Sequence, residues 1–138
     1  MDREKEIDVC GTWLSYNNGK NEYIFKPPII PDMIKANLFF KNVIFHSTVI
    51  FRKLLNCGDI VKYNEKYKRA QDYELLERIS KIGKVGNINE ILVENKGHER
   101  SIFSKDRKGQ IKASNKVRIK QLKILGLGGY QRRKRTPY

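Results

Sequence analysis

A hairpin signal near the N-terminus is the feature that most constrains the fold of this chain. Residues 17–20 read Asn-Asn-Gly-Lys, a composition typical of a tight turn between antiparallel strands. Before the turn, residues 7–13 alternate loosely between apolar and polar side chains, and after it Tyr23–Phe25 has the composition of a return strand. Pro27 and Pro28 end that strand. The sequence therefore predicts a chain that begins with an antiparallel ribbon.

Helix signals follow the ribbon. Asp32 can cap a short helix through Phe39, with apolar contacts from Met33, Ile34 and Leu38. Asp72 opens a second helix that runs to about Ile82, and Gly83 suits the position after its end. The apolar stripe predicted for this second helix consists of Leu75, Leu76 and Ile79.

The remaining segments of the body predict strands and loops. Asn42–Phe51 is rich in β-branched and aromatic residues and predicts a buried strand, which a helical turn over Arg52–Cys57 follows. Residues 63–71 are polar and aromatic, as in a loop. Residues 85–88 and 91–93 predict two short strands. Together these elements indicate an α/β domain with a small mixed sheet and flanking helices.

Charge divides the chain into two parts. The formal net charge is +14 over 138 residues, but residues 101–138 hold 12 Lys and Arg and one acid, Asp106. We therefore expect a domain over residues 1–104 and a basic, partly helical tail over residues 105–138. Within this tail the apolar spacing of residues 117–125 fits a helix or a strand.

The two cysteines favour a reducing compartment. Cys10 and Cys57 lie far apart, and no Cys or His cluster has the spacing of a zinc site. We expect both to be reduced thiols in a cytoplasmic protein, without a secretory leader or a membrane-spanning segment.

Three segments occur in an order that suggests a family. The first is Asn42–Lys53 (NVIFHSTVIFRK), the second is residues 63–67 (YNEKY) leading into Ala70–Leu75 (AQDYEL), and the third is Ile91-Leu92 followed by residues 98–102 (HERSI). Together they resemble the acceptor-side, C-terminal half of family-2 glycosyltransferases of GT-A fold. The resemblance spans about residues 7–104.

The resemblance implies an inverting transfer of a sugar from a nucleotide-sugar donor to a glycan or lipid-linked acceptor. Asp72 would act as the general base on the acceptor hydroxyl, and Gln71 and Tyr73 would help to shape the site. His46 and His98 are further candidates for substrate binding. The simpler interpretations are that Asp72 only caps its helix and that His46 is a core histidine.

The chain also departs from the family pattern. Asn95-Lys96 stands where the family has Tyr-Arg before the histidine, which weakens a diphosphate role for His98. No Asp-x-Asp occurs, although the family uses that motif to hold a divalent metal, Mn or Mg, against the donor diphosphate. We therefore expect an incomplete enzyme that is inactive alone, exposes apolar surface, and is poorly stable or self-associates.

A binding module without chemistry is the alternative. The basic tail, residues 105–138, could lie on anionic lipid at the inner membrane face or bind nucleic acid phosphate. Nucleic acid is the less favoured partner because aromatic residues such as Tyr16, Phe45 and Tyr67 lie in the body and are not interleaved with the basic residues of the tail.

Overall fold

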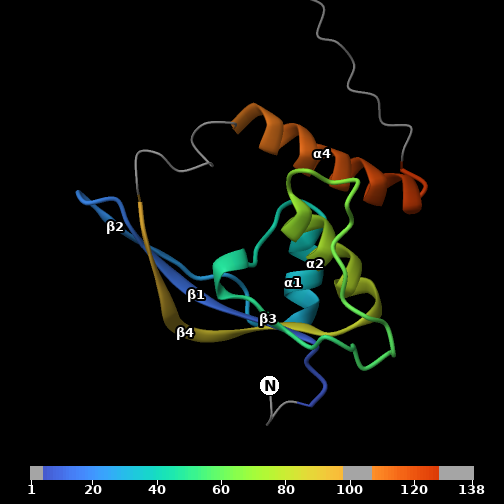
Figure 1. Cartoon of the computed structure of the whole chain (residues 1–138), viewed down its shortest axis with the longest axis horizontal. Helices are drawn as coiled ribbons and strands as arrows, with labels where there is room; N and C mark the ends of the chain where they lie inside the picture. The colour runs from blue at the N-terminus through green and yellow to red at the C-terminus, as the bar shows by residue number, and fades with distance from the viewer. Residues whose placement is uncertain (1–4, 98–106, 128–138) are drawn as a thin grey trace, which may run out of the picture.

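A computed structural model of the chain describes residues 5–97 and 107–127. The elements run β1 (Val9–Asn17), β2 (Glu22–Phe25), α1 (Pro31–Leu38), η1 (His46–Thr48), β3 (Ile50–Phe51), α2 (Gln71–Ile82), β4 (Val85–Lys96) and α4 (Arg107–Ile124). Figure 1 shows α1 and α2 between the sheet and α4, which lies farthest from the strands. The predicted small α/β fold with a mixed sheet is confirmed.

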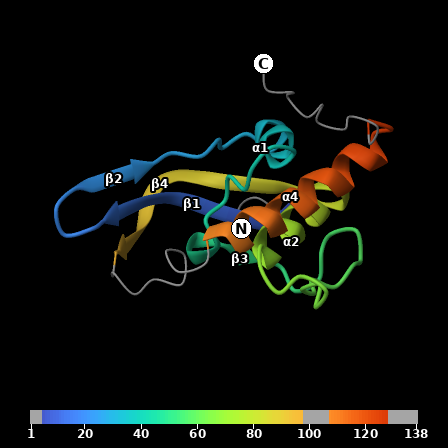
Figure 2. The same cartoon turned by 90° about the horizontal axis from the view of Figure 1, so that it is seen from above.

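Strand β1 is the centre of the sheet. It pairs in parallel with β4 from Val9 to Asn17, and antiparallel with β2 and β3. Because β4 follows one edge of β1 along its whole length, β2 and β3 share the opposite edge. The view from above in Figure 2 shows β1 and β4 running side by side and extending beyond the helices.

The predicted hairpin between β1 and β2 is confirmed. Asn17 pairs with Glu22, and the side-chain oxygen of Asn18 accepts hydrogen bonds from the amides of Lys20 at 3.0 Å and Asn21 at 2.7 Å. Gly19 adopts a φ of +85°, which a residue without Cβ reaches at little cost. The turn composition thus fixed both the existence and the place of this ribbon.

The prediction of two short strands after α2 is wrong, because β4 is one continuous strand. Ile88 pairs with Thr12 and Ile91 with Trp13, so the register shifts at this point. The intervening polar residues, Asn89 and Glu90, form an irregularity within the strand and do not interrupt it.

The predicted buried strand over Asn42–Phe51 is also wrong. Val43 and Ile44 are buried, but His46–Thr48 forms a 3-10 turn and only Ile50–Phe51 joins the sheet. The Thr48 hydroxyl donates to the Phe45 carbonyl at 2.8 Å and accepts from the Thr12 amide at 3.2 Å. The Thr48 side chain therefore supplies hydrogen bonds to backbone groups that a strand would pair with a neighbouring strand. Amino-acid composition alone does not reveal such bonds.

The helical turn predicted over Arg52–Cys57 is absent from the structure. Leu54 instead forms a β-bridge with Ile60, and the chain reverses at Gly58, whose φ is +91°. A carboxylate oxygen of Asp8 accepts the Asn56 amide at 2.7 Å, which holds this reversal against the start of β1.

Helix α1 forms where it was predicted but begins differently. Ile30 is its N-cap and Pro31 its first residue, so Asp32 does not cap it. Ile34 and Leu38 are buried as expected, whereas Met33 is 53% exposed and does not belong to the core.

Helices α2 and α4 complete the core. The predicted stripe of Leu75, Leu76 and Ile79 is buried in α2. The ambiguous segment after Lys116 is helical, and Val117 of α4 is fully buried against the core. No helix in residues 5–97 or 107–127 is long and apolar enough to cross a bilayer.

Candidate functional site

Asp72 lies in the first turn of α2, where the backbone amides are free to face an anion. Ala70 is the N-cap, in a left-handed conformation with a φ of 53°, and no side chain caps the helix. The interpretation of Asp72 as an N-cap is therefore wrong. Its carboxylate still benefits from the positive end of the helix dipole.

Asn42 orients the carboxylate of Asp72. Its Oδ1 accepts the amide of Ile44 at 3.1 Å, which fixes the side chain, and its Nδ2 donates to Oδ2 of Asp72 at 2.9 Å. Within residues 5–97 and 107–127, Oδ1 of Asp72 accepts no hydrogen bond. One carboxylate oxygen is thus held in place while the other is available to a ligand.

A cavity of about 770 Å³ opens beside Asp72 between η1, the start of α2 and α4. This volume suits a small ligand such as one or two sugar rings. Its lining combines polar and apolar side chains: Asn42, Ile44, Phe45, His46, Ala70, Asp72, Tyr73, Arg107, Gln110, Ile111, Ser114 and Arg118.

His46 lies on the cavity wall with an aromatic neighbour. The hydroxyl of Tyr63 is 3.5 Å from Nε2 of His46, and the two rings meet edge to face at a centroid distance of 6.1 Å. Burial raises the pKa of Tyr63, and the negative charge of Asp72 raises it further. Tyr63 therefore keeps its proton at neutral pH.

Tyr73 lines the cavity with its ring but directs its hydroxyl into the protein. The hydroxyl donates to the Leu38 carbonyl at 2.7 Å, and Nε2 of Gln121 donates to the same carbonyl at 3.1 Å. Burial raises the pKa of Tyr73, while Arg118 partly offsets that rise. This shared carbonyl joins the end of α1 to α2 and α4 behind the cavity.

Arg118 brings a cation to the cavity from α4. Its Nη1 donates to Asn115 at 2.8 Å, but its buried Nε has no hydrogen-bond partner among the described residues. A buried guanidinium nitrogen without a partner is costly, and an anionic or hydroxyl-bearing ligand would satisfy it.

The loop before α2 is held by a buried carboxylate. Glu74 is 1% exposed, and Arg78 approaches it at 3.3 Å while donating to the Lys62 carbonyl at 2.6 Å. Nδ2 of Asn64 and Nζ of Lys120 lie 3.4 Å and 3.8 Å from Glu74. These contacts fix the position of the α2 N-terminus and so of Asp72.

The structure thus brings together three of the predicted site residues, Asp72, His46 and Tyr73. Gln71 is exposed at the first position of α2 and is not in the cavity lining, and His98 lies outside the described residues. Asn42 was not among the predicted site residues, although it begins the first of the three segments. The cavity residues that α4 contributes were not predicted either.

The missed α4 residues share one face of the helix. They are spaced by three or four positions, which places them on one side of a helix: Arg107, Gln110, Ser114 and Arg118. This spacing was visible in the sequence, but its meaning depends on knowing that α4 packs over the α2 N-terminus.

The described residues provide no metal centre. Within residues 5–97 and 107–127, no three side chains of His, Cys, Asp or Glu gather closely enough to hold an ion. Among these residues, Asp72 accepts from the side-chain amide of Asn42, and no second carboxylate lines its cavity. The divalent metal that the resemblance implies therefore does not fit this part of the chain.

A comparison with known proteins finds a relative named "Uncharacterized glycosyltransferase" in Haemophilus influenzae, 30% identical over 95 residues. The aligned region is 69% of this chain and 28% of the relative, so the chain spans less than a third of the relative's length. No family model matches the chain, and no solved structure matches it.

Proposed function

We propose that this chain is the acceptor-side part of a glycosyltransferase. The observation that carries the proposal is the Asp72 carboxylate, oriented by Asn42 at 2.9 Å on the wall of a cavity of about 770 Å³. The similarity to a protein named as a glycosyltransferase supports the same class. The finer assignment to family 2 and the GT-A fold rests on the three sequence segments.

In the proposed reaction Asp72 is the general base of an inverting transfer. The acceptor hydroxyl oxygen attacks the anomeric carbon of the donor sugar and gives its proton to Asp72. The bond between that carbon and the diphosphate oxygen breaks, and the nucleoside diphosphate leaves with the electron pair. Asn42 holds the carboxylate in position for the proton transfer, which requires hydrogen-bond contact with the attacking oxygen.

The other cavity residues would bind the acceptor. His46 can exchange hydrogen bonds with sugar hydroxyls, and Arg118 can donate from its Nε, which has no partner among the described residues. The nucleotide sugar and the divalent metal would be bound by parts of the enzyme outside the described residues. The acceptor that we propose is a glycan or a lipid-linked glycan.

Titration of the ¹⁵N-labelled chain with oligosaccharides tests the acceptor site. We expect the largest amide shifts at η1, at the first turn of α2 and along the Arg107–Arg118 face of α4. Ser114→Trp fills the cavity from α4 and should abolish these shifts. Its matched control, Ile124→Trp, replaces a 64% exposed side chain of α4 that lies outside that lining, and it should leave these shifts unchanged. Shifts confined to other surfaces, or unaffected by Ser114→Trp, would contradict the assignment.

A further inference from the structure

A second cavity, of about 820 Å³, lies between α4 and the loop that precedes α2. Six of its twelve lining residues are cations and none is an acid: the cations are Lys66, Lys68, Arg69, Lys108, Lys112 and Lys116. We call this cavity the basic groove. Such a concentration of one charge creates a positive potential that attracts anions and is screened by salt.

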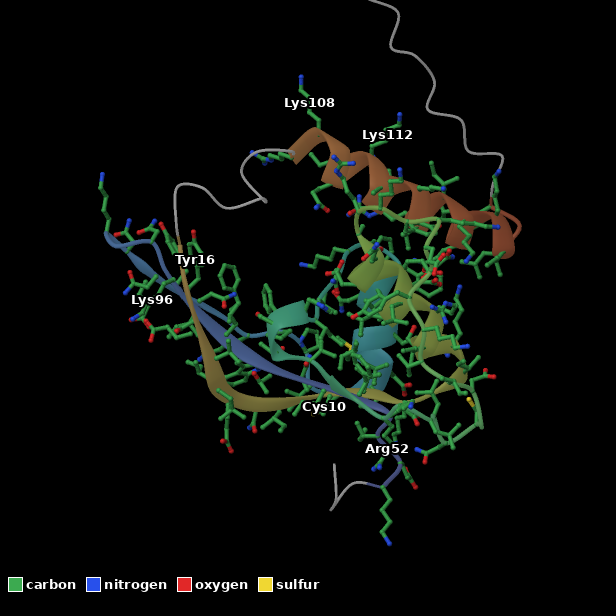
Figure 3. The ribbon with its side chains drawn as sticks, in the orientation of Figure 1. Cys10, Tyr16, Arg52, Lys96, Lys108 and Lys112 are labelled. Carbon is green, nitrogen blue, oxygen red and sulfur yellow. The ribbon has the colours of Figure 1, made fainter. Side chains whose placement is uncertain are left out.

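The lysines of α4 form a fixed row on the surface. Lys108, Lys112 and Lys116 are spaced by four positions and so share one face of the helix. Val117, which is 0% exposed, and Gln121 anchor the opposite face to the core. Figure 3 shows Lys108 and Lys112 pointing away from the body on the outer side of α4. The row is therefore displayed by the folded protein without any rearrangement.

Apolar side chains stand beside these lysines. Ile111 is 50% exposed, Ile119 is 53% exposed and Leu122 is 40% exposed, and the two isoleucines line the basic groove. A helix face that carries both lysines and exposed isoleucine and leucine offers cations to lipid headgroups and apolar side chains to the acyl boundary.

We propose that the outer face of α4 and the basic groove dock onto the surface of an anionic lipid bilayer. The groove would hold lipid headgroup phosphates, and Ile111, Ile119 and Leu122 would insert between the lipids. Each lysine near such a surface strengthens binding independently of the others.

A nucleic acid fits this surface less well. Proteins that bind single strands usually offer aromatic rings on which bases stack. The one aromatic residue of the groove, Tyr67, is only 7% exposed, and Nζ of Lys116 covers its ring at 4.8 Å. The exposed isoleucines would also gain nothing from contact with a phosphate backbone.

Docking in this orientation would place the Asp72 cavity at the membrane surface. Ile111 lines both cavities, so the bilayer would meet the protein at the edge of the candidate active site. This arrangement suits an acceptor that is itself anchored in the membrane. Membrane docking does not depend on the transferase proposal, because it rests on α4 and the groove alone.

Co-sedimentation of the full chain with vesicles tests the docking surface. We expect binding to phosphatidylcholine vesicles that contain phosphatidylglycerol and not to phosphatidylcholine alone. Lys108→Gln/Lys112→Gln should lower the partition coefficient on the order of 25-fold, since each lysine contributes about a factor of five. Ile119→Ser should lower it on the order of tenfold without any change in charge.

The matched control removes the same charge elsewhere. Lys20→Gln/Lys96→Gln neutralises two exposed lysines, one in the β1–β2 turn and one at the end of β4 beside it. It should leave the partition coefficient within about threefold. Equal losses in both double variants would overturn the proposal, since only net charge would then matter. It would also fail if Ile119→Ser had no effect, if removing residues 128–138 alone abolished binding, or if RNA bound more tightly than the vesicles.

Discussion

Asp8 is expected to hold three segments of the fold together. Its Oδ1 accepts the Asn56 amide at 2.7 Å, its Oδ2 accepts the Lys84 amide at 2.9 Å, and the residue is 1% exposed. Asp8→Ala removes both acceptors. A hydrogen bond to a charged group contributes about 1.5–3 kcal/mol to stability. The lower value applies here because both donor residues border solvent, so the loss of two such bonds should cost about 3 kcal/mol.

Urea unfolding, followed by the fluorescence of the single tryptophan, Trp13, measures this loss. With an m-value of about 1–3 kcal/mol per M, the midpoint should fall by about 1–3 M. Asp59→Ala, which removes an exposed carboxylate, should change the free energy of unfolding by less than about 0.5 kcal/mol.

A second substitution separates these hydrogen bonds from a general loss of packing. A Cβ on Gly83 would lie 2.6 Å from Oδ2 of Asp8, so Gly83→Ala must displace the carboxylate. We expect Gly83→Ala to cost about 2 kcal/mol in the natural protein but much less in the Asp8→Ala background. Additivity of the two substitutions within about 0.5 kcal/mol would refute the reasoning.

Three further substitutions or modifications test other parts of the structure. Burial raises the pKa of Tyr73 above 10.0, so the folded state favours the neutral phenol. The stability that the neutral phenol contributes is present below pH 10, and it is lost as the pH rises through the raised pKa. Tyr73→Phe should lower the free energy of unfolding, measured with urea, by about 1 kcal/mol at pH 8. When the pH is raised above 10, the variant should lose less stability than the natural protein, and equal losses in the two proteins would contradict this reasoning. Burial also raises the pKa of the Cys10 thiol, whereas Cys57 is exposed. A thiol reagent should therefore label Cys57 before Cys10, as peptide mapping would show, and labelling of both at equal rates would contradict this expectation. Val117→Ala should cost about 2 kcal/mol and speed amide exchange in α4, whereas Ile119→Ala, which truncates an exposed side chain, should do neither.

The parts of the fold that local chemistry determines were predictable. The hairpin depends on a four-residue turn, and α2 depends on the spacing of Leu75, Leu76 and Ile79, so both appear where the sequence indicates. The segment around Thr48 was not predictable in the same way, because its hydroxyl bonds to Thr12, 36 positions away. Side-chain hydrogen bonds of that kind override strand propensity.

The candidate site was predicted only in part for the same reason. Asp72 and His46 lie in segments whose order carried the resemblance, and both line one cavity. Arg107 and Arg118 reach that cavity from α4, and nothing local to these residues indicates where α4 packs. The charge count showed that residues 101–138 are basic. That α4 packs against the core through Val117, with one face over Asp72 and an outer lysine face, needed the tertiary structure.

Sugar transfer with Asp72 altered is the most direct test of the central claim. The assay uses the chain expressed with any polypeptide encoded beside it, and detects by mass spectrometry the sugar moved from nucleotide-sugar donors to glycan or lipid-linked acceptors. The account predicts transfer by the natural protein, a loss of about 10²–10⁴-fold in kcat for Asp72→Asn with acceptor binding retained, and no loss for Asp59→Asn. Transfer by Asp72→Asn at the natural rate would contradict the assignment of Asp72 as the base. No transfer by the natural protein with any donor would contradict the assignment to a glycosyltransferase.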